Sequence, residues 1–426
     1  MQIKVTKSIH IEQSDFLEDA WVRSLSYAAL DRDVLIESVL IGQQREFYYY
    51  HNHIEDPRPV LPYGLTRRSE DNGRTWTVVE RRPHFRPLRG RVRLEMWGPS
   101  FILHPRRGWL ARVYASNEDV PGLKAWDKGS PVQHSGRIWV QYSVDAGLTW
   151  TEPEQLIVCG AEYDADHWAP GVWVGRATGF VEAVVPVYVD DDTFVLPMNK
   201  AAYEPGRDGL AGYQSGLLLG RWMSPTSIEW NGGRYVYIDR PYSIFGADEP
   251  CLARLPDGRL LMSLRVQATG QASDPPGRRY FATSSDMGKT WSTPDFFRYD
   301  DGGDVYNPGC LGHILRAAKN GRMYLITHLL DRPSPNGQLP RDFLHVVEFD
   351  ADTLRVRRDT VTVIEGFAQP PEKWDDCWYS NWVWYEDRQT KNLVLFMTGN
   401  PGDQGRHDRC NVPPHSFRYE LDPPGV

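Results

Sequence analysis

Two short groups of histidine, tyrosine and carboxylate side chains could bind a metal or move protons. The run 48–53 (Tyr-Tyr-Tyr-His-Asn-His) contains a His-x-His pair, and His167 follows Asp164 and Asp166 closely. A His-x-His pair can bind zinc, but no third ligand follows at a recognisable spacing. The chain also lacks a phosphate-binding loop, a GxSxG turn and an HExxH motif. We therefore predict no metal and no cofactor.

Aromatic side chains are concentrated in one stretch near the C-terminal end. Four tryptophans lie within eleven positions: Trp374, Trp378, Trp382 and Trp384. Indole rings can stack on the faces of sugars, and they can equally pack into a hydrophobic core. The sequence leaves both roles open for these four residues.

An eight-residue pattern, S-x-D-x-G-x-T-W, occurs three times. The copies are 69–76, 143–150 and 284–291, spaced by about 70 and about 140 residues, with a degenerate copy at 227–230. The aspartate can accept hydrogen bonds from nearby backbone N–H groups. The glycine can adopt positive φ without a steric cost, and the tryptophan can pack under the turn. The pattern predicts a recurring tight turn between strands.

Composition and local pattern favour many short strands. The chain is 41% hydrophobic and 12% aromatic, with 37 Gly and 32 Pro. Apolar or aromatic runs bounded by Gly, Asp or Asn are typical of strands. Four such runs are 137–143, 259–265, 322–328 and 392–398.

The repeated pattern is that of the Asp-box, and through it the sequence resembles the sialidase (neuraminidase) superfamily. The resemblance implies an all-β fold, a six-bladed β-propeller, formed by a single domain over residues 1–426. At about 70 residues per blade, the length accommodates six blades. The Asp-box itself is expected to be structural, so function depends on other residues.

A longer stretch, 247–265, carries a second resemblance to sialidases. It contains Glu-Pro, then Leu-x-Asp-Gly-x-Leu-Leu, then a strand that ends in Arg. By this resemblance Glu249 activates the nucleophile, and Arg265 is one of three arginines that hold the substrate carboxylate. Guanidinium groups suit this task because they bind carboxylates bidentately and keep their charge.

A Tyr-Ser pair precedes the strand expected at 392–398, as in the last blade of sialidases. The resemblance implies that Tyr379 is the catalytic nucleophile. Sialidases use tyrosine where other retaining glycosidases use a carboxylate. A sialic acid carries a carboxylate on its anomeric carbon, which would repel an attacking Asp or Glu. A neutral phenol that passes its proton to Glu249 avoids this repulsion.

The remaining family positions are assigned by their place in the chain. Arg23 occupies the position of the first arginine, although the usual Arg-Ile-Pro is absent, and Arg45 lies further on in the same blade. Asp56 is our candidate acid/base. Arg341 is our candidate third arginine. The rivals are Glu55, His51 and His53 for Asp56, and Arg332 for Arg341.

Charge and composition restrict the partners. The net charge of −8 and a pI near 5.9 disfavour nucleic acid. No segment approaches the roughly 18 apolar residues of a membrane helix, so we expect no membrane partner. The oligomeric state stays unknown. Five scattered cysteines argue against a disulfide framework, and Cys159, Cys251 and Cys310 are expected in the core.

The N-terminal residues alternate like a strand and lack an apolar signal region. We expect a cytoplasmic protein as the sequence stands, or a secreted or periplasmic one if a signal has been removed.

Three functions follow from these patterns. The first is an exo-acting retaining glycoside hydrolase that releases a terminal sialic acid or a related ulosonic acid. The second keeps the propeller but acts on a uronic-acid polysaccharide as a lyase or hydrolase, with His and Tyr transferring protons. The third is a glycan-binding propeller without catalysis. An acidic glycan is the expected partner in the first two.

Overall fold

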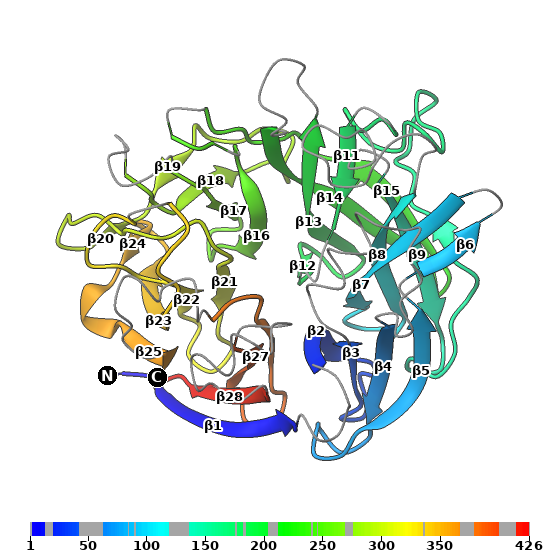
Figure 1. Ribbon diagram of the computed structural model, residues 1–426, viewed down its shortest axis with the longest axis horizontal. Coiled ribbons are helices and arrows are strands. Elements are labelled where there is room, and N and C mark those ends of the chain that lie inside the picture. The colour runs from blue at the N-terminus through cyan, green and yellow to red at the C-terminus, as the bar shows by residue number, and fades with distance from the viewer. Residues whose placement is uncertain are drawn as a thin grey trace. The chain divides into compact units, whose positions relative to one another are not determined.

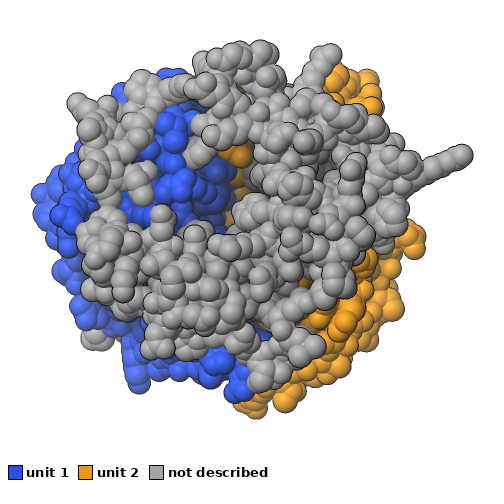
Figure 2. Space-filling model, viewed as in Figure 1, with its two compact units in different colours: residues 1–17, 235–426 blue, residues 18–234 orange. Residues whose placement is uncertain are grey.

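The fold was analysed in a computed structural model. Contacts divide the chain into two compact units (Figure 2): unit 1 comprises Met1–Leu17 and Tyr235–Val426, and unit 2 comprises Glu18–Arg234. The prediction of a single domain stays a prediction. The structure describes residues 2–12, 20–41, 63–83, 85–88, 91–118, 136–174, 177–181, 185–202, 212–239, 242–244, 246–268, 276–334, 337–366, 379–399 and 415–425.

Unit 2 contains three antiparallel sheets within its described residues (Figure 1). Their spatial orders are β2-β3-β4-β5, β10-β9-β8-β7-β6 and β11-β13-β14-β15, with β12 paired to β13. The strands are β2 (Ala20–Tyr27), β3 (Leu35–Ile41), β4 (Tyr63–Ser69), β5 (Thr77–Pro83), β6 (Phe85–Leu88), β7 (Arg91–Leu103), β8 (Leu110–Glu118), β9 (Arg137–Ser143), β10 (Glu154–Gln155), β11 (Ala177–Phe180), β12 (Val187–Tyr188), β13 (Thr193–Ala202), β14 (Gly212–Ser224) and β15 (Ser227–Gly232).

Unit 1 contains three further sheets and one 3-10 turn, η3 (Arg358–Thr360), within its described residues. The orders are β16-β17-β18-β19, β20-β24-β23-β22-β21 with β25 beside β23, and β1-β28-β27-β26. The strands are β1 (Lys4–Ile11), β16 (Asp248–Arg254), β17 (Leu260–Arg265), β18 (Tyr280–Ser284), β19 (Asp295–Phe296), β20 (Arg298–Tyr299), β21 (His313–Arg316), β22 (Met323–Thr327), β23 (Phe343–Asp350), β24 (Arg355–Val356), β25 (Thr362–Gly366), β26 (Val383–Glu386), β27 (Leu393–Thr398) and β28 (Ser416–Asp422).

The last sheet combines both ends of the sequence. β1 pairs antiparallel with β28 from Lys4 opposite Asp422 to Ile11 opposite Ser416. Figure 1 shows β1 running beside β28, with the two chain ends marked next to each other. The N-terminal strand therefore covers an edge of β28 that would otherwise expose unpaired backbone groups.

The three sheets of unit 1 pack through their faces. Met323 and Leu325 of β22 belong to a hydrophobic cluster shared with the β16–β19 sheet. Tyr324 and Ile326, on the opposite face of the same strand, belong to a cluster shared with the β1–β28 sheet. Alternating side chains of β22 are thus buried on both faces, which explains its uninterrupted apolar sequence.

The three repeated turns form nearly the same hydrogen bonds. Each one joins a strand to the edge strand that pairs with it: β4 to β5, β9 to β10 and β18 to β19. In the second copy, Asp145 accepts hydrogen bonds from the Thr149 N–H at 2.9 Å and from the Ser143 hydroxyl at 2.8 Å. The Gly147 N–H donates to the same hydroxyl at 2.8 Å, and Gly147 has φ +85°. The degenerate copy at 227–230 starts β15, the outermost strand of its sheet.

In the second copy of the turn, the tryptophan, Trp150, packs against a buried arginine. The Arg112 guanidinium carbon lies 4.2 Å from the Trp150 ring centroid, and Phe101 packs at 6.2 Å. Arg112 in turn pairs with the Glu80 carboxylate, with one contact at 3.0 Å. The turn is therefore anchored by stacking and by charge, and both contributions are structural.

Replacement of the turn aspartate Asp145 should lower the stability of the protein. Asp145→Ala removes the acceptor for the Thr149 N–H and two hydroxyl groups, so the free energy of unfolding should fall by about 1–2 kcal/mol. Denaturant unfolding measures this loss, and Asp145→Asn, which keeps one oxygen, should lose less. A folded Asp145→Ala protein with unchanged stability would contradict the structural role.

Acid should weaken the same turns. Hydrogen bonds from Thr75 hold the pKa of Asp71 at about 2, and those from Thr290 hold the pKa of Asp286 at about 2. Carboxylates with a lowered pKa contribute stability above the unfolded pKa of about 4, and this stability is lost as the pH falls towards 2. Melting temperatures between pH 5 and pH 2 should drop less steeply in the double variant Asp71→Asn/Asp286→Asn. An equal drop in both proteins would contradict the assignment.

Candidate active site

A β-bulge in unit 1 places two consecutive carboxylates beside one arginine. Asp248 of β16 pairs with Arg265 of β17, and the next pair is Cys251 with Ser263, so Glu249 and Pro250 oppose Leu264 alone. Glu249 has φ +41°, which few residues with side chains adopt. In a regular strand, neighbouring side chains point to opposite faces, whereas a bulge can redirect one of them. Both carboxylates consequently reach Arg265.

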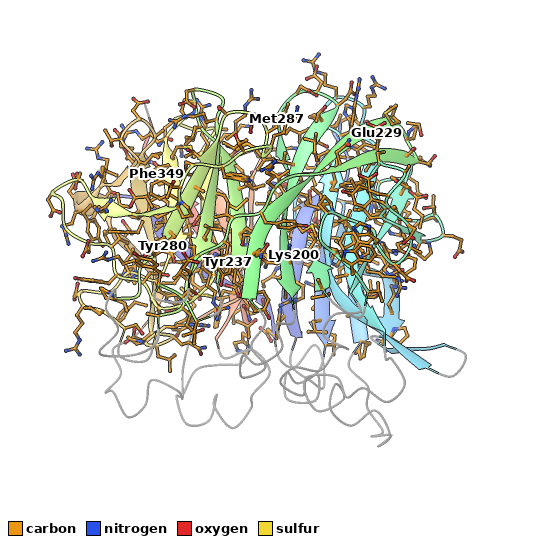
Figure 3. All side chains as sticks on the ribbon, turned by 90° about the horizontal axis from the view of Figure 1, so that it is seen from above. Lys200, Glu229, Tyr237, Tyr280, Met287 and Phe349 are labelled. Carbon is orange, nitrogen blue, oxygen red and sulfur yellow. The ribbon has the colours of Figure 1, made fainter. Side chains whose placement is uncertain are left out.

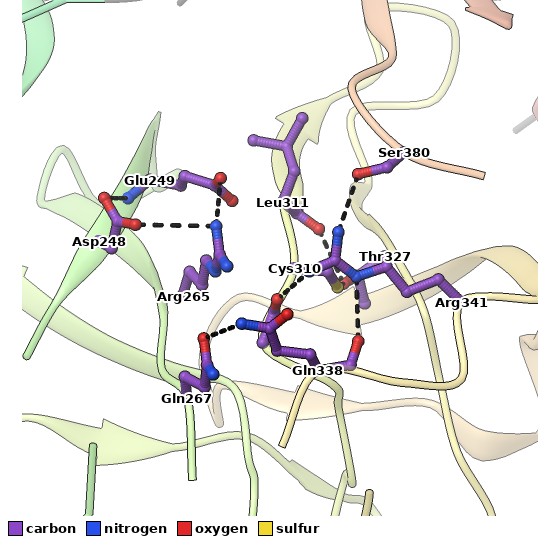
Figure 4. Close-up of polar contacts among 12 residues, drawn as sticks. Asp248, Glu249, Arg265, Gln267, Cys310, Leu311, Thr327, Gln338, Arg341 and Ser380 are labelled. Atoms are coloured by element: carbon purple, nitrogen blue, oxygen red, sulfur yellow. Dashed lines mark hydrogen bonds and ion pairs between the residues drawn. The ribbon is translucent and has the colours of Figure 1, made fainter. Parts of the chain in front are cut away.

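The ion pairs of this group are short and asymmetric (Figure 4). Arg265 Nη1 donates to Glu249 Oε1 at 2.6 Å and lies 3.7 Å from Asp248 Oδ2. The Glu249 N–H also donates to Asp248 Oδ1 at 2.8 Å. The side chains of Asp248, Arg265 and Glu249 are 15%, 17% and 29% exposed, so solvent reaches all three.

Two side chains of this group, those of Glu249 and Arg265, have atoms that can still form hydrogen bonds. Glu249 Oε2 is buried and accepts no hydrogen bond from any residue that the structure describes, Tyr379 included. Arg265 donates through Nη1, and its Nε and Nη2 groups donate to none of the described residues. A buried polar atom without a partner calls for an explanation, and a bound ligand or water is the usual one.

The charges of the group shift its protonation. Burial raises the pKa of Asp248 to about 6, the Glu249 carboxylate adds to this rise, and Arg265 opposes it. Burial alone would lower the pKa of Arg265, but Glu249 and Asp248 more than offset this and raise it. Arg265 therefore stays charged, whereas Asp248 changes its charge near pH 6.

Arg341 lies near this group and is held by backbone oxygens (Figure 4). It is 6% exposed, and it donates to the Gln338 carbonyl at 3.1 Å, to the Gly309 carbonyl and to the Ser380 hydroxyl at 3.4 Å. Burial lowers the pKa of Arg341 to about 10, and the positive charge of Arg265 contributes to the shift. The two arginines are thus close enough to repel each other, which favours binding of an anion near them.

Tyr379 lies next to Arg341 through the backbone. The Tyr379 N–H donates to the Arg341 carbonyl at 2.9 Å, and Tyr379 forms a bridge with Gly399 at the end of β27. Its side chain is 5% exposed and belongs to the same hydrophobic cluster as Trp382 and Tyr419. The structure therefore brings Tyr379 and Arg341 together, and Glu249 and Arg265 together, within one unit.

The other predicted residues lie elsewhere. Asp56 is outside the described residues, as are its rivals Glu55, His51 and His53, and also Arg45, Trp374 and Trp378. Arg23 lies on β2 in unit 2, with its guanidinium carbon 4.7 Å from the Trp21 ring centroid. Arg332 is exposed, unlike Arg341. Trp382 is 1% exposed and packs in the core, and Trp384 packs against it partly buried.

Four residues near the site were not singled out from the sequence: Asp248, Arg279, His313 and His328. Arg279 is fully buried and donates to the Ser263 hydroxyl at 2.6 Å and to the Cys310 and Gly312 carbonyls. Burial lowers the pKa of both histidines to about 3, so they are neutral. The sequence contains one indication of the bulge that brings Asp248 close to Arg265, namely Pro250 within an otherwise regular strand.

The described residues also bear on the predictions about metal ligands, cysteines and membrane spans. They contain no group of three or more His, Cys, Asp or Glu side chains placed to hold a metal. His167 stacks on Trp173 with ring centroids 3.7 Å apart. Cys251 and Cys310 are buried as expected, but the expectation was wrong for Cys159, which is exposed. No helix within the described part of the chain is long and apolar enough to span a membrane.

Comparisons with known proteins identify the fold. No family model and no curated protein matches the sequence. Among solved structures, a protein of unknown function from Dyadobacter fermentans is 16% identical, with a TM-score of 0.56, over 98% of this chain and 99% of that one. The Hadza microbial sialidase Hz136 is 14% identical, with a TM-score of 0.57, over 97% of this chain and 68% of that one. Trypanosoma rangeli sialidase is 14% identical, with a TM-score of 0.56, over 99% of this chain and 60% of that one.

These similarities confirm the predicted fold class, an all-β, six-bladed β-propeller of the sialidase type. The three sheets of each unit correspond to its blades. At this level of identity the comparison shows the fold and leaves the chemistry to the site.

Arg265 should bind anions through the geometry of its guanidinium group as well as through its charge. Arg265→Lys keeps the charge but loses the planar set of N–H donors, so affinity for an acidic monosaccharide should fall by about 10-fold or more. Calorimetric titration measures the affinity, and Arg259→Lys, at the far end of the same hairpin, serves as the matched control. Unchanged affinity in Arg265→Lys would show that Arg265 is not a carboxylate ligand.

Proposed function

We propose that this protein is an exo-acting retaining glycoside hydrolase that releases a terminal sialic acid or a related ulosonic acid. The observation that carries the proposal is Arg265, with Nε and Nη2 unengaged among the described residues, beside the partly unsatisfied Glu249. Arg341 and the Tyr379 backbone lie in the same unit, and the fold is that of sialidases. A cationic group next to a carboxylate base suits a substrate that is itself an anion.

Each residue has a role in this proposal. Tyr379 attacks the anomeric carbon, and Glu249 accepts its proton. A tyrosine of ordinary pKa, about 10, is inert at neutral pH, so it needs such a base. Asp56 is the acid/base that protonates the leaving group. Arg265 and Arg341 hold the substrate carboxylate, and Arg23 is the candidate from the sequence for the remaining arginine of the three.

The ligands bound in two similar structures support an acidic ligand. One Trypanosoma rangeli sialidase structure is described as a complex with a difluorinated 2-keto-3-deoxy-nononic acid, and it is 15% identical to this chain. A Streptococcus pneumoniae sialidase is described as a complex with an ammonio-ethanesulfonate, at 12% identity. Both ligands carry an acidic group, which is the feature that Arg265 would recognise.

A second candidate, a lyase or hydrolase acting on uronic-acid polysaccharides, has one observation in its favour. His328 is fully buried, its Nδ1 contacts the Phe343 carbonyl at 2.7 Å, and its Nε2 has no partner among the described residues. Its Nε2 would be the proton acceptor in this chemistry, although burial holds the pKa of His328 at about 3. The charge of Arg341 acts on His328, and both share the unit of Tyr379. This chemistry would produce an unsaturated sugar.

The decisive variant is Tyr379→Phe, which removes one oxygen and leaves packing almost unchanged. Loss of a nucleophile should lower the turnover number by about 10³-fold or more, while binding persists. A fluorinated acidic-sugar inactivator should add mass to the wild-type peptide that contains Tyr379. Assays with a fluorogenic sialoside and peptide mass spectrometry measure the two effects.

The matched control is Tyr419→Phe, because Tyr419 belongs to the same hydrophobic cluster and its hydroxyl donates a hydrogen bond to the Glu365 carboxylate at 2.8 Å. This variant should keep its turnover. Full activity in a folded Tyr379→Phe protein would overturn the mechanism. An ultraviolet-absorbing product without an adduct would favour the lyase, and neither adduct nor product would favour a glycan-binding protein.

A further inference from the structure

Asp248 adds a third charge to a site that would otherwise hold one carboxylate and one arginine. The bulge at Glu249 and Pro250 aims Asp248 and Glu249 at the same guanidinium group. The Glu249 N–H donates to Asp248 Oδ1 at 2.8 Å, which fixes the orientation of the Asp248 carboxylate. With both carboxylates ionised, their charges and that of Arg265 sum to about −1, which weakens the attraction that Arg265 and Arg341 together exert on a further anion.

We propose that Asp248 is a positioning residue that competes with the substrate carboxylate for Arg265 and releases this arginine when it takes up a proton. The inference rests on the proposed function, in which Arg265 binds the carboxylate of the sugar. It goes further by naming the residue that sets how tightly this carboxylate binds at a given pH. The competition acts through the charge of the guanidinium group, because Asp248 Oδ2 lies 3.7 Å from Arg265 Nη1.

Asp248 changes its charge between pH 5 and pH 7, and the charged groups around it can be named. Burial raises the pKa of Asp248 to about 6. Arg279, directly before β18, and Arg341, in the segment before β23, are buried arginines whose pKa is lowered. From β21, His313 has a pKa of about 3 and is neutral above pH 5. Among the described residues, the pKa of the Cys251 thiol is raised to about 11, so this thiol is neutral as well, and Cys310 and Glu249 are further ionisable groups near Arg265.

The direction of the pH effect follows from these charges. Above pH 6, Asp248 is ionised and shares Arg265, so the affinity for an acidic sugar is low. Below pH 6 it is protonated, and Arg265 is shared by Glu249 and the ligand alone. The ligand stays ionised, because the pKa of such a carboxylate is about 3.5. Affinity should therefore rise roughly 5-fold between pH 7 and pH 5.

The experiment measures binding of free sialic acid by calorimetry in the Tyr379→Phe protein, from pH 7 to pH 5. The dissociation constant should fall roughly 5-fold as the pH is lowered. Adding Asp248→Asn should give a dissociation constant at pH 7 that equals the low-pH value, with little change across the range. Asp248→Glu should restore the pH dependence.

The matched control is Asp257→Asn, which removes the same charge at the turn between β16 and β17, the opposite end of this hairpin. It should keep the pH dependence. Binding that is equally pH-dependent with and without Asp248 would overturn the inference and leave the proposed function intact. Absence of sialic acid binding at every pH would instead overturn the proposed function, and the inference with it.

Discussion

The contact between Glu249 and Arg265 imposes the strongest physical constraint on this protein. Removing a charge from water is costly, and a buried ion pair is tolerated when both partners are close and the remaining polar atoms are satisfied or reachable by solvent. Here a bulge, a positive φ and the pairing of β16 with β17 keep the two groups 2.6 Å apart. Arg279 and Arg341 are buried as well, but their charges are stabilised by hydrogen bonds that they donate mainly to backbone carbonyls and hydroxyl groups.

The two ends of a sheet have separate tasks. In the sheet of β16–β19, Leu260 lies opposite Ser284, where the repeated turn begins, whereas Leu264 lies opposite Tyr280. Five residue steps along β17, about 17 Å, therefore separate Leu260, beside the turn, from Arg265. Figure 3 shows Met287, in the turn, at one edge of the strands and Tyr280 further from that edge. Stability is thus concentrated at one end of the hairpins, and the charged group is built at the other.

The sequence predicted the features that depend on short-range pattern or on a repeated motif. The turns at Asp71, Asp145 and Asp286 were predictable because their hydrogen bonds join residues at most four positions apart. The family resemblance singled out Glu249 and Arg265 as site residues, but it did not predict the ion pair between them. Asp248 was missed because its role depends on the register between two strands, which local pattern does not encode. Two partners of Arg341, Gly309 and Ser380, lie more than 30 positions away, and burial of this kind is equally invisible in the sequence.

The pairing of β1 with β28 also has a consequence for how the protein is made. β1 leaves the ribosome roughly 400 residues before its partner strand β28. At translation rates of about 5–20 residues per second, β1 waits some 20–80 s without its partner. During this time the edge of an amphipathic segment is open to pairing with other chains. Its composition suits the delay, because two lysines and mostly exposed side chains discourage such encounters until the C-terminal strand arrives.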